Sequence, residues 1–421
     1  MTTIKTNKRK IFNDPIYGFI TIPFPIIFHL IEHPYFQRLR RISQLGLSNL
    51  VYPGALHTRF HHALGAMHLM GEAIDIIRSK GHEISEEEAK GVTIAILLHD
   101  IGHGPYSHAL ENTLAKNVHH EELSLLLMKE LNKAFSGELE LAMEIFTNRY
   151  HKQFLHQLVS SQLDMDRLDY LKRDSFYSGV SEGVIGSDRI IKMLEVIDDQ
   201  LVIEEKGKYS IEKFLVARRL MYWQVYLHKA VVSAEFILVN ILKRAKFLTE
   251  QNINLFASPA LHLFLTEKIT LEDFTVRKEL LTAFTELDDY DIMGAIKVWA
   301  KHSDKVLSFL CQSMINRRLF KTKIANEAWS ETTIDSLVKL CAEIYHIPKE
   351  EARYLVIHIS MSNHAYNAND ERINLLLKNG ETKDVSLASD NFNISALSKE
   401  VTKYFLCLPK EVFERASKQV F

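Results

Sequence analysis

Four residues able to bind a metal or a phosphate lie close together in LLHDIGHGPYSH, residues 97–108. His99 and Asp100 directly follow the apolar run IAILL, and His103 and His108 come soon after. Imidazole and carboxylate groups are good ligands for divalent metal ions. A buried polar group without a partner costs about 1–3 kcal/mol, so a buried helix ending in His-Asp is unfavourable as packing alone. The segment therefore predicts a ligand site at the end of a buried helix.

Two other segments offer ligands from predicted helices. Arg59 and His62 are three residues apart, so they share one helix face, and DMDRLDYLKRD places Asp166, Asp169 and Asp174 on one face. One His, one His-Asp pair and one later Asp would supply four ligands and leave positions for water and substrate. Each residue taken singly also has a structural interpretation. A lone histidine on a helix is more often a polar residue with its hydrogen bonds made within the protein, and Asp169 could be a charge on the helix surface.

Capping signals define the helices that must position these residues. TRFHHALGAMHLMGEAIDIIRSKG is predicted to be a helix with Thr58 as N-cap and Gly81 as its stop. SEEEAKGVTIAILLHD opens with a capping box, Ser85 and Glu88, and its apolar second half indicates a central buried helix. Further helices are predicted for HHEELSLLLMKELNKAF and SQLDMDRLDYLKRDSF.

The rest of the chain is predicted to be mostly helical with short strands. KIFNDPIYGFITIP indicates a hairpin with its turn at Pro15 and Gly18. A second hairpin turn is expected at Gly207, followed by one long helix through LVARRLMYWQVYLHKAVVSAEFILVNILKRAKFL and further helices to about residue 345. ARYLVIHISMSN and INLLLKNGETKDVSL are predicted strands, the latter with an Asn379-Gly380 turn, before a last helix over roughly 395–418.

Composition sets the class of protein. The 421 residues are 47% apolar and 25% charged with a net charge of −2, which is typical of a globular chain and gives nucleic-acid binding no support by charge alone. Three widely spaced cysteines, the absence of a secretory h-region and the absence of an 18-residue apolar stretch favour a cytoplasmic, non-membrane protein. We expect a mainly α fold, with a helical core over 1–245 and a C-terminal region of helices and a small β element over 246–421, without a clear linker between them.

The motifs, taken in order, resemble a known family. TRFHHALG, LLHDIGHGPYSH, HHEELS and DMDRLDYLKRD resemble the H…HD…D signature of HD-domain phosphohydrolases. NDPIYGFITI, HPYFQRLRRISQLG, VYPGALHTRFHHALG and RRLMYWQVYLHK are similar to deoxynucleoside triphosphate (dNTP) triphosphohydrolases, over about residues 9–235. The resemblance implies an HD-domain helical core and metal-dependent hydrolysis of dNTPs to deoxynucleoside and inorganic triphosphate.

The resemblance also implies roles for individual residues. The metal, one or more ions of Fe, Mn, Mg, Zn or Ni, would be bound by His62, His99, Asp100 and Asp166. His108 is favoured as general acid for the 5′-oxygen, with His103, His120 and Glu111 near it, although Glu111 stands where a relative has Asp. The substrate would contact, from its phosphates to its sugar, Arg59, Arg167, Arg218, Gln44, Leu45, Tyr170, Asp174 and Tyr226. Outside the resemblance, these tyrosines and arginines would be ordinary core or surface residues.

Regulation and assembly rest on the same resemblance. Some relatives bind a nucleotide effector at a subunit interface, which here would involve Lys10, Asn13, Glu32, Gln37 and Arg40, and which implies a homodimer or homotetramer. Two other functions stay open: another HD phosphohydrolase (a 5′-nucleotidase or an alarmone or cyclic-nucleotide hydrolase), or a nucleic-acid-binding sensor with a vestigial site. A monophosphate enzyme would not need an arginine at the γ-phosphate, so Arg218 favours the triphosphohydrolase.

Overall fold

The computed structural model describes residues 10–106, 113, 118–363, 366–367, 372–389 and 399–419. Two helices lie at the centre of its N-terminal half, α3 (Arg59–Ser79) and α4 (Glu86–Leu98), and α9 (Met165–Ser178) packs against α3. Ten of the 13 residues of α4 are buried, as the sequence predicts. The predicted capping box is confirmed, because Ser85 and Glu88 exchange hydrogen bonds of 2.8 and 3.1 Å between side chain and backbone.

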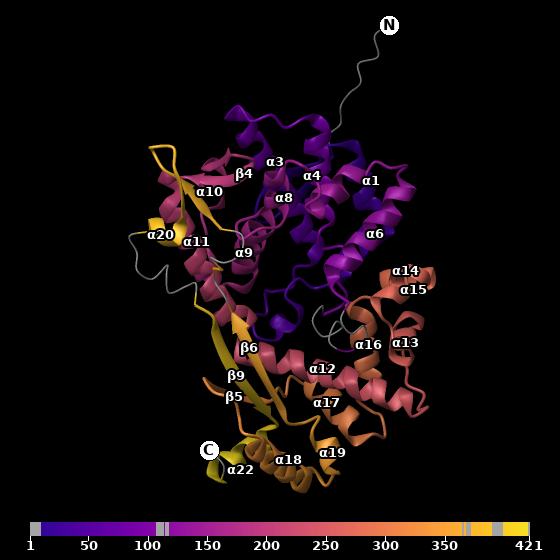
Figure 1. Ribbon diagram of the computed structural model, residues 1–421. Helices are drawn as coiled ribbons and strands as arrows, with labels where there is room; N and C mark the ends of the chain where they lie inside the picture. The colour runs from indigo at the N-terminus through magenta and orange to yellow at the C-terminus, as the bar shows by residue number, and fades with distance from the viewer. Residues whose placement is uncertain are drawn as a thin grey trace.

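Helices make up most of the described chain (Figure 1). The N-terminal half adds α1 (Pro25–Glu32), α2 (Pro34–Gln37), α6 (His120–Ala134), α7 (Glu140–Phe146), α8 (Gln153–Val159), α10 (Ser187–Lys192), α11 (Lys208–Met221) and α12 (Lys229–Glu250). The C-terminal half contains α13 (Pro259–Thr266), α14 (Leu271–Val276), α15 (Lys278–Glu286), α16 (Asp289–Trp299), α17 (Lys305–Ile315), α18 (Glu331–Tyr345), α19 (Lys349–Ala352), α20 (Val385–Ala388) and α22 (Lys410–Gln419). The prediction of a mainly α fold with a small β component is confirmed.

In the described part of the chain the strands form three small sheets. They are β1 (Ile11–Asp14) with β2 (Gly18–Thr21); β3 (Leu194–Ile197), β4 (Gln200–Glu204), β7 (Asn374–Leu376) and β8 (Thr382–Asp384); and β5 (Lys321–Ala325), β9 (Val401–Leu408) and β6 (Ile357–Asn363). Two predicted turns are confirmed: the β1–β2 turn begins at Pro15 and leads into Gly18, the first residue of β2, at φ +74°, and the β7–β8 turn contains Gly380 at φ +86°.

One strand pair joins distant parts of the chain. β4 pairs in parallel with β7, so the yellow C-terminal segment returns to the upper part of the molecule in Figure 1. A single cluster of buried apolar side chains extends from Ile20 to Ala416. The division into 1–245 and 246–421 stays a prediction; its boundary falls inside α12, and the β4–β7 pairing crosses it.

The predicted hairpin turn at Gly207 is wrong. The turn of the β3–β4 hairpin is Asp198-Asp199, where both residues have positive φ, as a two-residue hairpin loop requires. Gly207 has φ −84° and starts α11 instead. A Cβ there would lie 2.7 Å from the Ile203 side chain and 3.0 Å from that of Met193, so close packing requires this glycine.

The single long helix predicted after Gly207 is also wrong, because it is broken in two. One π-helical turn, Tyr222–Tyr226, ends α11, and His228 then starts α12 by accepting a hydrogen bond from the amide of Ala230 at 3.2 Å. The two segments are bent by 56°. Among the described residues no single helix is long and apolar enough to span a membrane; this bent pair meets those criteria only when its two segments are taken together.

The last helix was predicted too long. Residues 401–408 form β9, the central strand between β5 and β6, and within the described residues 399–419 the helix covers Lys410–Gln419. VTKYFLCL is rich in β-branched and aromatic residues, which favour a strand between two neighbours. β5 likewise interrupts the stretch to residue 345 that was predicted to be helical throughout.

Candidate active site

The ends of three helices bring potential metal ligands to one point. His62 lies in the first turn of α3, His99 directly follows α4, and Asp166 lies in the first turn of α9. Asp164 begins α9 by accepting a hydrogen bond from the amide of Arg167 at 2.7 Å. One ligand atom from each of the three residues lies within 4.8 Å of the other two. The helix ends therefore place all three side chains around a single position.

The distances around this position are short. The Oδ1 atom of Asp166 lies 3.1 Å from His62 Nε2 and 3.5 Å from His99 Nε2, and the two Nε2 atoms are 3.4 Å apart. Asp100 completes the group: its Oδ1 is 3.3 Å from His99 Nε2, and its Oδ2 is 3.8 Å from His62 Nε2. All four residues predicted to bind metal are therefore brought together.

The surroundings of the two imidazoles suit metal binding. His62 Nδ1 bonds Asp169 Oδ2 at 2.7 Å, and His99 Nδ1 bonds the carbonyl of Ile96 at 2.6 Å. Both Nδ1 atoms face acceptors and so act as donors, which leaves each Nε2 with a lone pair. Two lone pairs 3.4 Å apart repel unless a proton or a cation lies between them. This donor set fits a divalent metal ion.

The pKa of His62 shows how strongly the carboxylates favour positive charge here. Burial acts to lower this pKa, but hydrogen bonds to Asp166 and Asp169 raise it to about 10. A metal cation would replace this proton, since metal ligation requires the neutral imidazole.

Behind His62 a buried ion-pair chain fixes Asp169. Arg173 is fully buried and donates to both oxygens of Asp169 at 2.9 Å and to Asp14 Oδ2 at 2.8 Å. Burial acts to raise the pKa of Asp169, but Arg173 and His62 lower it to about 2, so the carboxylate is ionised. Gly65 makes room for this pair, because a Cβ there would lie 2.0 Å from Asp169 Oδ1.

The Asp169→Asn variant is expected to bind the metal about 10–100-fold more weakly, because a carboxylate that accepts from a ligating histidine orients the ring and strengthens its basicity. Metal titration of the folded variant, followed by calorimetry, measures the effect. Asp188→Asn is the control: this exposed carboxylate lies on α10 beside Lys172, and its loss should leave the affinity unchanged. An affinity equal to that of the wild type in Asp169→Asn would contradict the positioning role.

A second group of ligand-type side chains adjoins the first. Asp100, His103 and His120 each offer an atom within 4.8 Å of the others, and the rings of His103 and His120 stack with centroids 3.7 Å apart. Arg59 donates from Nη1 to Asp100 Oδ2. Burial and, next, Arg59 lower the pKa of His103 to about 3, so its imidazole is neutral. The two histidines are thus placed beside the proposed metal position; their catalytic roles stay predictions.

Gly102 lets the turn after α4 approach α6. A Cβ at this position would lie 2.2 Å from the carbonyl oxygen of His120 and 2.3 Å from the amide of Ser124. Ser124 ties the two segments together, accepting from the Gly102 amide at 2.9 Å and donating to the His99 carbonyl at 2.7 Å. The glycine therefore does more than end the helix.

Gly102→Ala is expected to destabilise the protein by at least about 1–3 kcal/mol, because both contacts are with backbone atoms that cannot rotate away. Urea unfolding measures the change. Gly71→Ala is the control within α3, where a Cβ would meet nothing within 4 Å and helix propensity predicts a stabilisation of up to about 1 kcal/mol. Equal stability of the two variants would show that the turn can move away from α6.

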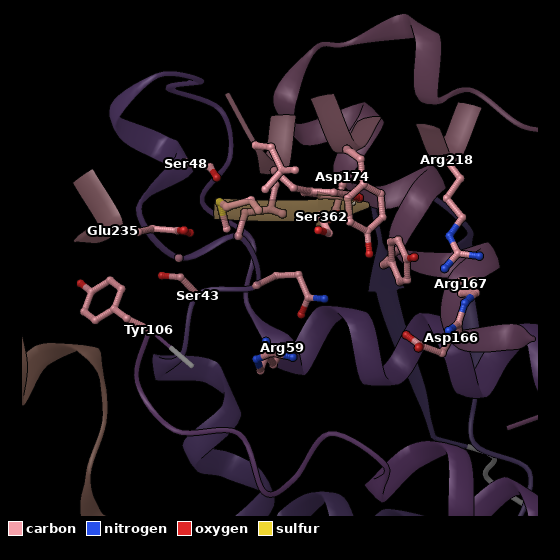
Figure 2. A pocket seen from close by; sticks show the side chains of 18 residues that line it. Ser43, Ser48, Arg59, Tyr106, Asp166, Arg167, Asp174, Arg218, Glu235 and Ser362 are labelled. Atoms are coloured by element: carbon pink, nitrogen blue, oxygen red, sulfur yellow. Dashed lines mark hydrogen bonds between the residues drawn. The ribbon is translucent and has the colours of Figure 1, made fainter. Parts of the chain in front are cut away.

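A cavity of about 520 Å³ opens beside the ligand cluster (Figure 2). All eight predicted substrate-binding residues line it, as does the ligand Asp166. Figure 2 shows Arg218, Arg167 and Asp166 together at one end, and Tyr106, Ser43 and Glu235 at the other. Asp164 Oδ2 holds the Arg167 guanidinium at 2.5 Å. The cationic end and the metal ligands therefore share one side of the cavity.

The predicted sugar-side residues form a hydrogen-bonded unit. Asp174 bonds His57 Nε2 at 2.8 Å through Oδ1 and accepts from the Tyr226 hydroxyl at 2.8 Å through Oδ2. The ring of His57 stacks on Tyr177 with centroids 4.4 Å apart, and Tyr170 meets Tyr226 edge-on. Asp174 is thus held rigidly at the cavity wall.

Several predictions fall elsewhere. His108 and Glu111 lie outside the described residues. The predicted effector residues do not line the active-site cavity: Lys10 lies over the Phe28 ring, Gln37 bonds the Ile31 carbonyl and Arg40 Nε, and Asn13 and Glu32 are exposed. An effector site there stays a prediction.

Sequence reasoning missed residues whose partners are distant in the chain. Asp169 carried a usable signal, its position on the same helix face as Asp166, but the sequence equally allowed a surface charge. His57 and Arg38 gave no local signal. The C-terminal half also contributes unpredicted lining residues, Met361 and Ser362 of β6.

The comparisons with known proteins agree with this geometry. The protein-family model described as HD domain matches residues 59–174 of this chain, and the family model described as HD associated region matches residues 185–255. A solved phosphohydrolase of Bacteroides thetaiotaomicron is 55% identical with a TM-score of 0.92, over 95% of this chain and 100% of that one. The uncharacterized protein YwfO of Bacillus subtilis is 33% identical over 97% of this chain and 94% of its own.

A more distant relative has a named activity. The deoxynucleoside triphosphate triphosphohydrolase SAMHD1 homolog of Dictyostelium discoideum is 34% identical over 56% of this chain, which spans 49% of that protein. The segment matched by the HD domain contains all four proposed metal ligands, and the similarity to the Bacteroides phosphohydrolase and to YwfO covers nearly the whole chain. This chain therefore belongs to the HD-domain phosphohydrolases, a family of metal-dependent hydrolases.

Proposed function

We propose that this chain hydrolyses dNTPs to deoxynucleoside and inorganic triphosphate. The support comes from one cavity that joins a metal-ligand cluster, a cationic end and a rigid Asp174–Tyr226 unit. The likeness to the Dictyostelium triphosphohydrolase adds to this support. A monophosphate or cyclic-nucleotide substrate would use the metal cluster but would leave the cationic end without a partner.

Arg218 carries the proposal. It lies in the last turn of α11 with 8% of its surface exposed, and among the described residues its Nε and Nη1 atoms have no hydrogen-bond partner. Such buried unpaired donors cost about 1–3 kcal/mol each, and a bound polyphosphate would satisfy them. A triphosphate brings about four negative charges, which Arg218, Arg167 and the metal would offset inside a low-dielectric cavity.

The reaction proposed is attack of water on the α-phosphorus, with the deoxynucleoside as leaving group. When bound, a divalent metal would lower the pKa of a coordinated water toward ~7 and so supply the nucleophile. Arg167 and Arg218 orient the three phosphate groups of the substrate. A histidine, His108 or His120, protonates the departing 5′-oxygen.

The preference for a deoxy sugar would come from the opposite wall. Gln44 and Leu45 line the cavity, and Gln44 Oε1 is a buried acceptor without a partner in the described part of the chain. Asp174 would accept a hydrogen bond from the 3′-hydroxyl. The hydrogen bonds to His57 and Tyr226 hold the carboxylate in place, and each of its oxygens keeps a further lone pair for the substrate. Activation by a nucleotide at Lys10, Asn13, Glu32, Gln37 and Arg40, in a homodimer or homotetramer, belongs to the same proposal.

One experiment tests the proposal. The metal-loaded protein is incubated with each dNTP, alone and in pairs, and products are separated by ion-exchange chromatography. Deoxynucleoside plus triphosphate is the expected result, and activity only in mixtures would support an effector. Release of orthophosphate or pyrophosphate would overturn the reaction, and turnover restricted to deoxynucleoside monophosphates or cyclic nucleotides would favour the alternative HD phosphohydrolase.

A further inference from the structure

A buried carboxylate from the C-terminal half links two walls of the active-site cavity. Asp289, the first residue of α16, is 6% exposed. Its Oδ2 accepts a hydrogen bond from the amide of Ser43 at 2.8 Å, and its Oδ1 accepts one from the amide of Tyr106 at 3.2 Å. One side chain therefore holds two backbone segments that are far apart in the sequence.

Both segments carry residues of the site. Ser43 and Tyr106 line the cavity, and Figure 2 shows them at the same end of it. Ser43 directly precedes Gln44 and Leu45, the proposed sugar-facing residues. Tyr106 follows His103 by three residues, in the turn that continues from the metal ligands. The carboxylate thus bridges the two segments that carry these lining residues.

The turn beside Tyr106 needs external support. Tyr106 has φ +48°, a left-handed conformation that a bulky residue adopts only when its surroundings enforce it. The fully buried Arg38 holds the preceding turn, donating to the carbonyl of His103 at 2.8 and 2.9 Å and to that of Ile101 at 3.2 Å. Arg38 also reaches the carbonyl of Leu287, two residues before Asp289, at 3.4 Å. Two sets of hydrogen bonds therefore connect the start of α16 to the turn of residues 101–106: those of Asp289 and those of Arg38.

We propose that Asp289 is a positioning residue that fixes the distance between the sugar-facing wall and the turn carrying the phosphate-facing histidines. The segments matched by the HD models end at residue 255, so this assigns an active-site role to the region beyond them. The proposal rests on the proposed function for the identity of the substrate, and on the Asp289 hydrogen bonds for the rest.

Asp289→Asn tests the proposal, because asparagine has the same size but can accept only one of the two amide hydrogen bonds. For dATP we expect kcat to fall about 10–100-fold, since displacements near 1 Å cost on the order of 100-fold. KM should stay within about threefold, because Arg167 and Arg218 are untouched. Metal content should equal that of the wild type. Hydrogen exchange should become faster in peptides containing Ser43 and Tyr106.

Asp288→Asn is the matched control. Asp288 pairs with Arg41 and caps α16, so the substitution removes the same charge from the same helix end, and asparagine also caps well. It should leave kcat unchanged, and hydrogen exchange in the peptides containing Ser43 and Tyr106 should proceed at the wild-type rate. If Asp289→Asn does not fold, Asp289→Glu, which keeps both oxygens on a longer side chain, should lower kcat with KM unchanged.

The outcomes separate the two proposals. An unchanged kcat in folded Asp289→Asn, or a fall matched by Asp288→Asn, would overturn the role of Asp289. A wild-type protein that releases no deoxynucleoside from any dNTP would overturn the proposed function only. The hydrogen-exchange comparison would then decide the Asp289 proposal by itself, with unchanged exchange in both segments counting against it.

Discussion

The Asp166→Ala variant is expected to lose its bound divalent metal and at least on the order of 10³-fold in turnover, which corresponds to more than about 4 kcal/mol of transition-state stabilisation. The reason is geometric. Asp166 Oδ1 is the carboxylate oxygen within 3.5 Å of both His62 Nε2 and His99 Nε2. Without it, Asp100 would be the remaining acidic ligand, and Arg59 already bonds that carboxylate.

Two measurements check this result on the same purified sample. Elemental analysis gives metal per chain, and product release from a dNTP mixture gives turnover. Asp335→Ala is the control, since Asp335 lies on α18 and pairs with the exposed Arg353 away from the cavity. Because the Asp166 side chain is 25% exposed, the variant should stay folded by circular dichroism. Retained metal and turnover would remove Asp166 from the ligand set.

The Arg218→Ala variant is expected to lower kcat/KM for dNTPs by about 100-fold. Hydrogen bonds to charged groups contribute about 1.5–3 kcal/mol each, and Arg218 offers a phosphate chain two buried donors that have no partner in the part of the protein that the structure describes. The neighbouring Arg219 is only half-buried and does not line the cavity, so Arg219→Ala provides a control that differs by one position.

A second substrate makes the Arg218 result diagnostic. Bis(p-nitrophenyl) phosphate has one phosphate, so its hydrolysis should depend on the metal cluster but little on Arg218. A large loss with dNTPs and a small loss with the aryl ester would locate Arg218 at the distal phosphates. Equal losses with both substrates would instead assign Arg218 to the fold or to the reacting phosphate.

Local signals in the sequence predicted that two of the ligand segments lie at helix ends, and the resemblance to HD-domain phosphohydrolases implied the full set of four ligands. Thr58 precedes the helix of His62, and the capping box of Ser85 and Glu88 starts the apolar helix that ends at His99. The structure adds a cap of the same kind, Asp164, at the start of the helix that carries Asp166. These signals act over a few residues, so they can be identified without tertiary structure.

The features that sequence reasoning missed depend on contacts between distant segments. The amide of Ser43 bonds Asp289, 246 positions away, and no local pattern announces such a partner. The same holds for the Arg38 contacts to His103 and Ile101. β9 was assigned to a helix because a short apolar run fits either period, and its place between β5 and β6 determines the strand.

The parallel pairing of β4 with β7 has a consequence for synthesis of the chain. β7 follows β4 by about 170 residues. At about 5–20 residues per second, the ribosome leaves the open edge of β4 without its neighbour for roughly 10–30 s. Exposed strand edges can pair with other chains, so this interval is when the nascent protein is most prone to aggregate. Slower translation after residue 204 would lengthen the time for which the edge is open. Chaperone binding to the nascent chain would reduce aggregation during that time.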